Sequence, residues 1–200
     1  MTNTEATHHV RFLFDPICPW AYQTSLWIRE AIQVRPLTIE WGLLSLEFIN
    51  REKKDDAYLT PLRRNRWTFR LLERARQIGG NQAIDDLYLA IGEARHDRNR
   101  SLTDQKMLEQ ALTSAGLSIS LLEETRTNQE IDEQLEHFYS QAVSQGAFGV
   151  PSLFLNDGQM PFYGPLLEIV PTGEEAGQLW DHISSLISLP YFYELKRGRT

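Results

Sequence analysis

The chain has 200 residues, of which 42% are hydrophobic, and a net charge of −7 from 20 basic and 27 acidic side chains. This length and composition suit one soluble globular domain, or one domain with a large insertion. The acidic balance argues against nucleic acid or an anionic membrane as a partner, and no apolar run approaches the ~20 residues of a membrane helix.

The start of the chain predicts a strand, a helix and a second strand. Residues 10–15 form an apolar run that ends before Pro16 and is typical of a buried strand. Residues 19–34 have helical spacing, with a proline in the first turn, where proline is tolerated. Residues 37–46 predict the next strand, so this segment is expected to form a βαβ unit.

Residues 51–128 are charged and have helical periodicity along almost their whole length. We expect Thr103 to cap one helix and Gly116 to end it, while Gly79 and Gly80 end another. The expected helices cover residues 62–78, 83–96, 103–116 and 118–127.

The last part of the chain predicts a helix over 130–146, a hairpin over 150–164 that turns at residues 156–158, and a closing helix over 173–187. Together the elements predict an α/β thioredoxin-like fold with an α-helical insertion subdomain. The expected division is a first half at 1–50 (βαβ), a helical insertion that acts as a lid at 51–128, and a second half at 129–200 (αββα).

Cys18 is the only cysteine and stands directly before the predicted first helix. The unpaired N–H groups and positive dipole end at a helix start favour a thiolate, so a pKa below the free value of about 8.5 is predicted. The alternative is a buried cysteine without chemistry. One cysteine allows no internal disulfide, and no signal peptide is expected, so a cytoplasmic location is predicted, where thiols stay reduced.

A second candidate element is Gly149-Val150-Pro151, which precedes a predicted strand. Thioredoxin-like folds carry a cis proline at this place, with the backbone of the preceding residue facing the sulfur. X–Pro bonds are the peptide bonds that are cis at appreciable frequency. An ordinary trans proline that marks a strand start is the alternative.

The segments FDPICPWAYQTSLWI, GVPSLFLN, FYGP and GEEAGQLWD…YFYELKR resemble the DsbA-type family, in particular its mycothiol-dependent nitroreductase subfamily. The resemblance implies a reactive Cys18, a cis Pro151, a helical lid and a low-molecular-weight thiol as co-substrate, mycothiol or glutathione. Members that use mycothiol carry Cys-Pro-Trp-Cys, whereas Ala21 replaces the second cysteine here. The departure puts dithiol chemistry in doubt and leaves monothiol chemistry open. An engineered replacement of a cysteine would give the same sequence.

The resemblance also implies a set of residues that surround the sulfur. Core packing is the alternative for the aromatic members of this set, and solvent exposure is the alternative for Asn50 and Tyr58. Trp67 and Phe69 either face a substrate cleft or form the core of the lid. The basic run at residues 63–66 usually forms a solvated helix face, although a functional version would bind the carboxylate of a small thiol. The implied substrate- and thiol-binding residues are Pro19, Trp20, Ala21, Tyr22, Asn50, Tyr58, Val150 and Pro151.

The predicted function is a monothiol oxidoreductase that uses a small thiol, with mycothiol the expected one, to reduce a mixed disulfide or a small electrophile through Cys18. One alternative is a transferase or isomerase like the kappa-class glutathione transferases and chromene-carboxylate isomerases, which carry a serine at this corner and activate a bound thiol. The other is a binding or sensor module in which the thiol is reversibly capped. The sequence leaves the oligomeric state open, with a homodimer as one option.

Neither a metal nor a tightly bound cofactor is expected. His8, His9 and His96 do not have the spacing of metal ligands, and no Cys/His cluster is present. The glycine motifs of dinucleotide and phosphate loops are also absent from the sequence. The expected partners are therefore the small thiol and a small electrophilic or disulfide substrate.

Overall fold

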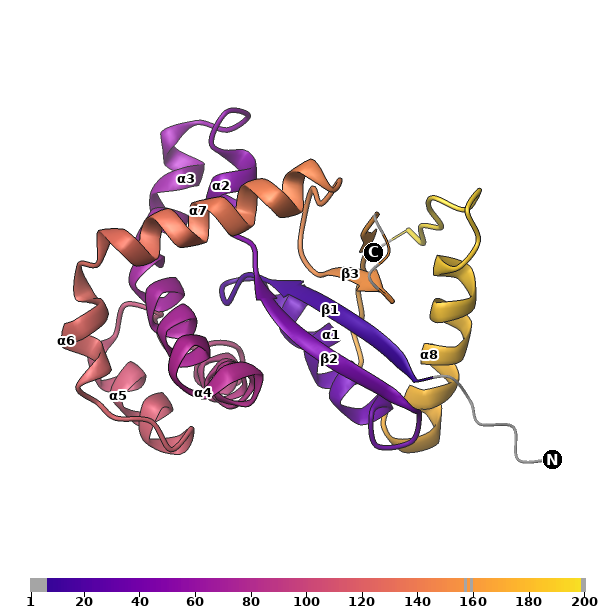
Figure 1. Ribbon diagram of the computed structural model, residues 1–200, viewed down its shortest axis with the longest axis horizontal. Helices are drawn as coiled ribbons and strands as arrows, with labels where there is room; N and C mark the ends of the chain where they lie inside the picture. Colours follow the sequence, from indigo (N-terminus) through magenta and orange to yellow (C-terminus); the bar gives the residue numbers. More distant parts are fainter. Residues whose placement is uncertain (1–6, 157, 159, 199–200) are drawn as a thin grey trace.

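The computed structural model describes residues 7–156, 158 and 160–198. Helices lie to the left and right of a mixed four-stranded sheet in Figure 1, and the order of the elements confirms the predicted α/β thioredoxin-like fold with a helical insertion. In chain order the elements are β1 (His8–Phe14), α1 (Pro19–Ala31), β2 (Leu37–Leu43), α2 (Leu46–Asn50), α3 (Asp56–Arg63), α4 (Arg66–Gly92), η1 (Glu93–Asp97), α5 (Gln105–Ser114), α6 (Leu121–Arg126), α7 (Gln129–Ser144), β3 (Ser152–Leu155), β4 (Phe162–Tyr163) and α8 (Gly173–Ile187).

The sheet has the strand order β2-β1-β3-β4. β1 runs parallel to β2 and antiparallel to β3, so the first and second halves of the chain meet at β1. β3 and β4 form the predicted hairpin, with Ser152 opposite Tyr163. Residue 157 of the predicted turn lies outside the described residues. This topology places the end of β1, the start of α1 and the start of β3 at one end of the sheet (Figure 1).

Two of the elements predicted at the start of the chain end earlier than expected. α1 stops at Ala31 because the next residues form a turn, in which Arg35 N–H donates to the Ala31 carbonyl, and Pro36 then disfavours helix at Arg35. β2 stops before Ser45 because the Ser45 hydroxyl accepts the N–H of Phe48 and caps the short helix α2. The Ser45 cap competes with a longer β2. The alternation of side chains along a strand does not reveal such a cap.

The helical insertion differs from its predicted elements in three ways. The two helices expected over 62–78 and 83–96 form α4 and η1, with the break at Gly80, whose φ of 67° is accessible to glycine. The cap of α5 is Asp104, which accepts the N–H of Met107, and not Thr103. α3 was not predicted. The boundaries at residues 50 and 128 remain a division made from the sequence. No helix in the described part of the chain is long and apolar enough to cross a membrane.

Tyr88 of α4 fixes the insertion against the sheet. Its ring stacks on Phe14 with centroids 3.6 Å apart and lies edge-on to Trp41 at 5.7 Å, and all three side chains are buried. Arg29 of α1 forms an ion pair with Asp85 of α4 on the same side. The insertion therefore packs directly beside α1, the helix that begins at Cys18.

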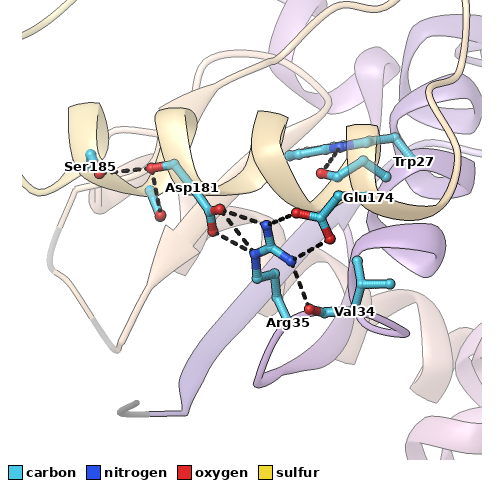
Figure 2. Close-up of polar contacts among 8 residues, drawn as sticks. Trp27, Val34, Arg35, Glu174, Asp181 and Ser185 are labelled. Atoms are coloured by element: carbon cyan, nitrogen blue, oxygen red, sulfur yellow. Dashed lines mark hydrogen bonds and ion pairs between the residues drawn. The ribbon is translucent and has the colours of Figure 1, made fainter. Parts of the chain in front are cut away.

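Arg35 joins the other end of α1 to α8 (Figure 2). Its guanidinium donates to both carboxylate oxygens of Asp181, at 2.8–3.0 Å, and to those of Glu174, at 2.7–3.1 Å. In the same figure the indole N–H of Trp27 donates to the Ala176 carbonyl at 3.0 Å. These contacts hold α1 in a fixed position on the sheet, and with it the residues at its first turn.

Candidate active site

Cys18 ends the loop between β1 and α1 and is the N-cap residue of α1. Its Sγ accepts the N–H of Ala21 at 3.5 Å and donates its hydrogen to the carbonyl of Val150 at 3.6 Å. The Val150–Pro151 peptide bond is cis, the form expected from the sequence. The sulfur therefore lies between the first turn of a helix and the residue before the cis proline.

Asp15 shapes the loop that carries Cys18. Its carboxylate accepts the N–H of Ile17 at 3.0 Å and the N–H of Leu46 at 2.8 Å, and its carbonyl accepts the N–H of Cys18 at 2.9 Å. The side chain is 2% exposed. Sequence reasoning used Asp15 only as the end of a strand. The sequence signal for this role is an aspartate placed directly after the apolar run of a buried strand, because a carboxyl at such a position is expected to be buried as well.

Burial raises the pKa of the Cys18 thiol, and the nearby Asp15 carboxylate raises this pKa further. The N–H groups of Ala21 and Trp20 act in the opposite direction and are outweighed. The expected lowering of the thiol pKa is therefore wrong in this structure, although the helix-start position is as predicted. The physical reason is that the side chain is 6% exposed, and a thiolate that loses its hydration is disfavoured more than two N–H groups favour it.

We therefore predict that Cys18 alkylation by iodoacetamide has a pH midpoint above that of an ordinary cysteine, about 8.5. The rate should rise with pH because only the thiolate reacts. Since Cys18 is the only cysteine, intact mass reports this one site directly. A midpoint below that of a denatured sample of the same chain would contradict the prediction.

The Asp15 carboxyl itself has a raised pKa, about 6, because it is fully buried. The N–H groups of Leu46 and Ile17 oppose this shift without cancelling it. Asp15 is therefore ionised at neutral pH, and its negative charge then disfavours the thiolate of Cys18.

Tyr22 connects α1 to η1 and does not point toward the sulfur. Its hydroxyl donates to the Asp97 carboxylate at 2.7 Å, and its ring, 1% exposed, stacks on His96 with centroids 4.9 Å apart. The Nε2 atom of His96 lies 3.0 Å from the carbonyl of Pro16 in the loop before Cys18. Core packing, the alternative left open for Tyr22, therefore describes its observed contacts.

Four other predicted site residues lie on α1, α2 and α3. Pro19 is exposed and Trp20 is half-buried in the first turn of α1, directly after Cys18. Asn50 donates to the Leu46 carbonyl within α2, and Tyr58 is 45% exposed on α3. Neither of the last two forms a hydrogen bond or ion pair with Cys18 in the described structure, so their role in binding stays a prediction.

Two aromatic residues of the insertion pack against neighbouring helices, Trp67 within the insertion and Phe69 against α7. Trp67 donates its indole N–H toward the Leu122 carbonyl and the Thr125 hydroxyl, each at 3.2 Å. Phe69 is 4% exposed and contacts Tyr139 edge-on. The contacts of Trp67 favour the lid-core alternative, whereas Phe69 packs between the insertion and α7.

A groove of about 270 Å³ includes Ile17, the residue before Cys18, in its lining. Its walls come from the active-site loop, from α3 and the turn into α4, and from η1 and the turn into α5. Sequence reasoning did not predict it, because its walls are far apart in the chain. The lining residues are Ile17, Pro61, Arg64, Asn65, Arg95, Asn99, Ser101, Leu102 and Thr103.

The described residues contain no group of three or more histidine, cysteine, aspartate or glutamate side chains that could hold a metal ion. The groups observed at this corner are the Cys18 thiol, the buried Asp15 carboxyl and the backbone of the cis-proline loop.

A cysteine at a helix start, beside a cis proline at one end of a mixed sheet with a helical insertion, is the arrangement typical of thioredoxin-like oxidoreductases of the DsbA type. Residues 17–197 match the family model described as "Rv2466c-like: Mycothiol-dependent nitroreductase Rv2466c". The chain belongs to this family. It is also similar to the uncharacterized protein Rv2286c of Mycobacterium tuberculosis, with 33% identity over 198 residues that span 96% of this chain and 82% of that protein.

Solved structures with this fold share little sequence with the chain. A 2-hydroxychromene-2-carboxylate isomerase matches with a TM-score of 0.65 and 16% identity over 90% of this chain and 96% of that one. A probable DsbA oxidoreductase, SCO1869 from Streptomyces coelicolor, matches with a TM-score of 0.64 and 15% identity over 96% and 94%. The cytosolic disulfide reductase DsbM from Pseudomonas aeruginosa with GSH matches with a TM-score of 0.58 and 15% identity over 89% and 100%. These likenesses show the fold.

Proposed function

We propose that this protein is a monothiol oxidoreductase that uses a low-molecular-weight thiol, mycothiol, to reduce mixed disulfides through Cys18. The observation that carries the proposal is the position of the Cys18 Sγ, between the first turn of α1 and the Val150 carbonyl beside cis-Pro151. The family description supports mycothiol as the co-substrate. The buried Ala21, where a resolving cysteine would stand, supports the monothiol cycle.

The proposed cycle has two thiol–disulfide exchanges. The Cys18 thiolate attacks the small-thiol sulfur of a mixed disulfide; a Cys18–small-thiol disulfide forms, and the substrate leaves as a thiolate that takes up a proton. A second molecule of the small thiol then attacks the bound small-thiol sulfur and releases Cys18. In sum, one mixed disulfide and one small thiol become one substrate thiol and one small-thiol disulfide.

A small electrophile is the second substrate type within the same proposal. Cys18 and one small thiol would then give the electrophile two electrons and two protons and be left joined as a Cys18–small-thiol disulfide. A second small thiol would release Cys18 by attack on the bound small-thiol sulfur, so that two small thiols leave as one disulfide. The residues proposed to hold the thiol are those around the sulfur, Trp20, Val150 and Pro151, together with Asn50 and Tyr58 at the edge. The reducing cytoplasm is the proposed location, because it keeps the single thiol reduced.

The raised pKa of Cys18 has a consequence for this cycle. A thiol with a high pKa leaves slowly when its mixed disulfide is attacked at the other sulfur. Since the chain also has no second cysteine, a Cys18 adduct with the small thiol should be long-lived and should accumulate. The adduct is therefore the species to look for.

The same raised pKa favours a second candidate function, a transferase or isomerase in which the bound small thiol is the nucleophile. A Cys18 that stays protonated would donate its hydrogen to the bound thiolate, as it donates to the Val150 carbonyl in the structure. In that case Cys18 would position the co-substrate and form no covalent adduct.

The experiment that separates these functions is intact mass spectrometry after a pulse of oxidised mycothiol and, separately, of oxidised glutathione. We expect one mycothiol adduct per chain, its release by added mycothiol, and turnover of a mixed-disulfide substrate. An adduct without turnover would indicate a sensor module, and turnover without an adduct would indicate the transferase-like function. Absence of both would refute the proposal.

A further inference from the structure

The groove next to the Cys18 loop has two arginines in its lining. Arg64 and Arg95 contribute guanidinium groups, and the lining residues include no aspartate or glutamate. The Arg95 guanidinium donates to the carbonyl of Arg100 at 3.3 Å, and Arg64 has no ion pair in the described part of the chain. Two cations in a groove whose lining includes no carboxylate favour an anionic ligand.

The neighbours of Arg64 in the basic run behave differently. Arg63 pairs with Asp56 at 2.8 Å and with Glu47 at 3.4 Å, and Arg66 approaches the same Glu47 at 3.5 Å. The run is therefore divided: its flanking arginines form surface ion pairs, as a solvated helix face would, and Arg64 with Asn65 faces the groove.

Asn65 gives an independent indication of a ligand. The residue is 5% exposed, lies in the wall of the groove, and its amide nitrogen has no hydrogen-bond acceptor among the described residues. A buried N–H donor without an acceptor is costly, and most such groups in folded proteins are paired. An oxygen atom of a ligand in the groove would supply the acceptor.

The groove lies next to the loop that carries Cys18. Ile17 is a lining residue and is adjacent in the chain to Cys18, so their Cα atoms are about 3.8 Å apart. The Val150 carbonyl contacts the sulfur from the cis-proline loop, which does not line the groove. The groove therefore adjoins the loop that carries the sulfur, and the cis-proline loop contacts the sulfur itself.

From these observations we infer that the groove binds the anionic group, a carboxylate or a phosphate, of the small molecule that reacts with Cys18, while the co-substrate thiol approaches from the cis-proline side. The inference rests on the proposed reactivity of Cys18 and adds the substrate class to it. Arg64 and Arg95 bind the charge, and the amide of Asn65 donates to one of its oxygens.

The test compares two disulfide reagents on the single thiol of the full chain. 5,5′-Dithiobis(2-nitrobenzoate) carries carboxylates and 2,2′-dithiodipyridine is neutral; with both, the Cys18 thiolate forms a mixed disulfide and an aryl thiolate leaves. The ratio of the two rate constants cancels the shared effect of the thiol pKa. We expect Arg64→Gln combined with Arg95→Gln to lower the ratio of the anionic to the neutral rate constant by about tenfold. Asn65→Leu should lower it in the same direction.

Arg98→Gln is the matched control, because Arg98 pairs with Glu93 at 3.6 Å and does not line the groove. It removes one cation from the same region and should leave the ratio unchanged. Arg64→Gln alone, at an exposed position, provides the test if the double variant does not fold. An equal ratio in the parent chain and in a folded Arg64 variant would overturn the inference, as would an equal fall in the control.

Protection of Cys18 from the neutral reagent identifies the anion. Benzoate should protect if the site takes a carboxylate, and phenyl phosphate should protect if it takes a phosphate; no protection by either at millimolar concentration would overturn the inference. Failure of the proposed function would look different: the charge preference would persist, but the chain would show no turnover with any small thiol.

Discussion

Ala21→Cys should form a disulfide with Cys18 and shorten the life of a small-thiol adduct by tenfold or more. Cα atoms three residues apart on an α-helix are about 5 Å apart, within the range of about 4.4–6.8 Å over which disulfides join Cα atoms. The Ala21 amide nitrogen is already 3.5 Å from the Cys18 Sγ. An intramolecular thiol attacks with an effective concentration far above that of a free thiol, so internal release should outrun external release.

The measurement is a time course of intact mass after one pulse of oxidised mycothiol. The parent chain should keep the adduct until free thiol is added, the Ala21 variant should lose it and show the mass of an internal disulfide, and Cys18→Ser should show neither adduct nor reductase activity. Gln33→Cys is a control for an added thiol, because Gln33 is exposed beyond the far end of α1. An Ala21 variant that keeps the adduct as long as the parent does would contradict a monothiol site of this geometry.

Asp15→Asn should flatten the pH dependence of stability by about 3 kcal/mol between pH 4 and pH 7. In the folded chain the pKa of this buried carboxyl is about 6, compared with 3.8 for an ordinary aspartate. The folded state therefore binds the proton more tightly than the unfolded state, so this carboxyl lowers the free energy of unfolding as the pH rises from about 4 to about 6. At about 1.4 kcal/mol per pKa unit, the full cost at neutral pH is about 3 kcal/mol.

Asparagine cannot ionise, so the variant should not show this loss. It should nevertheless be less stable than the parent at pH 4, where Asp15 is protonated. The two oxygens of the neutral carboxyl can still accept the N–H groups of Ile17 and Leu46, whereas the NH₂ group of asparagine would face one of these donors with a second donor. Urea unfolding at several pH values measures both effects, with Asp86→Asn on the exposed face of α4 as the control for a lost charge. Parallel stability curves for parent and variant would show that Asp15 does not titrate in this range.

The order of elements could be predicted from the sequence because each one has a local signal. The apolar run before Asp15, the proline in the first turn of α1 and the acidic first turn of α8 are properties of short segments, and the closing helix has the bounds predicted, Gly173–Ile187. The predicted boundaries of elements were wrong where a side-chain cap, and not the hydrophobic periodicity, sets where an element begins or ends. Asp104, and not Thr103, caps α5, and Ser45 ends β2 by capping α2.

The features of the site are likewise of two kinds, those predicted from the sequence and those seen only in the tertiary structure. The sequence alone determined that a single thiol stands at a helix start, that Pro151 precedes a strand, and that Ala21 leaves the thiol without an internal partner, since these are facts of residue identity and order. Only the tertiary structure decided the direction of the Cys18 pKa and the existence of the groove. The burial of Cys18 and the charges around it depend on segments that are distant in the sequence but adjacent in space. No local sequence pattern therefore predicts them.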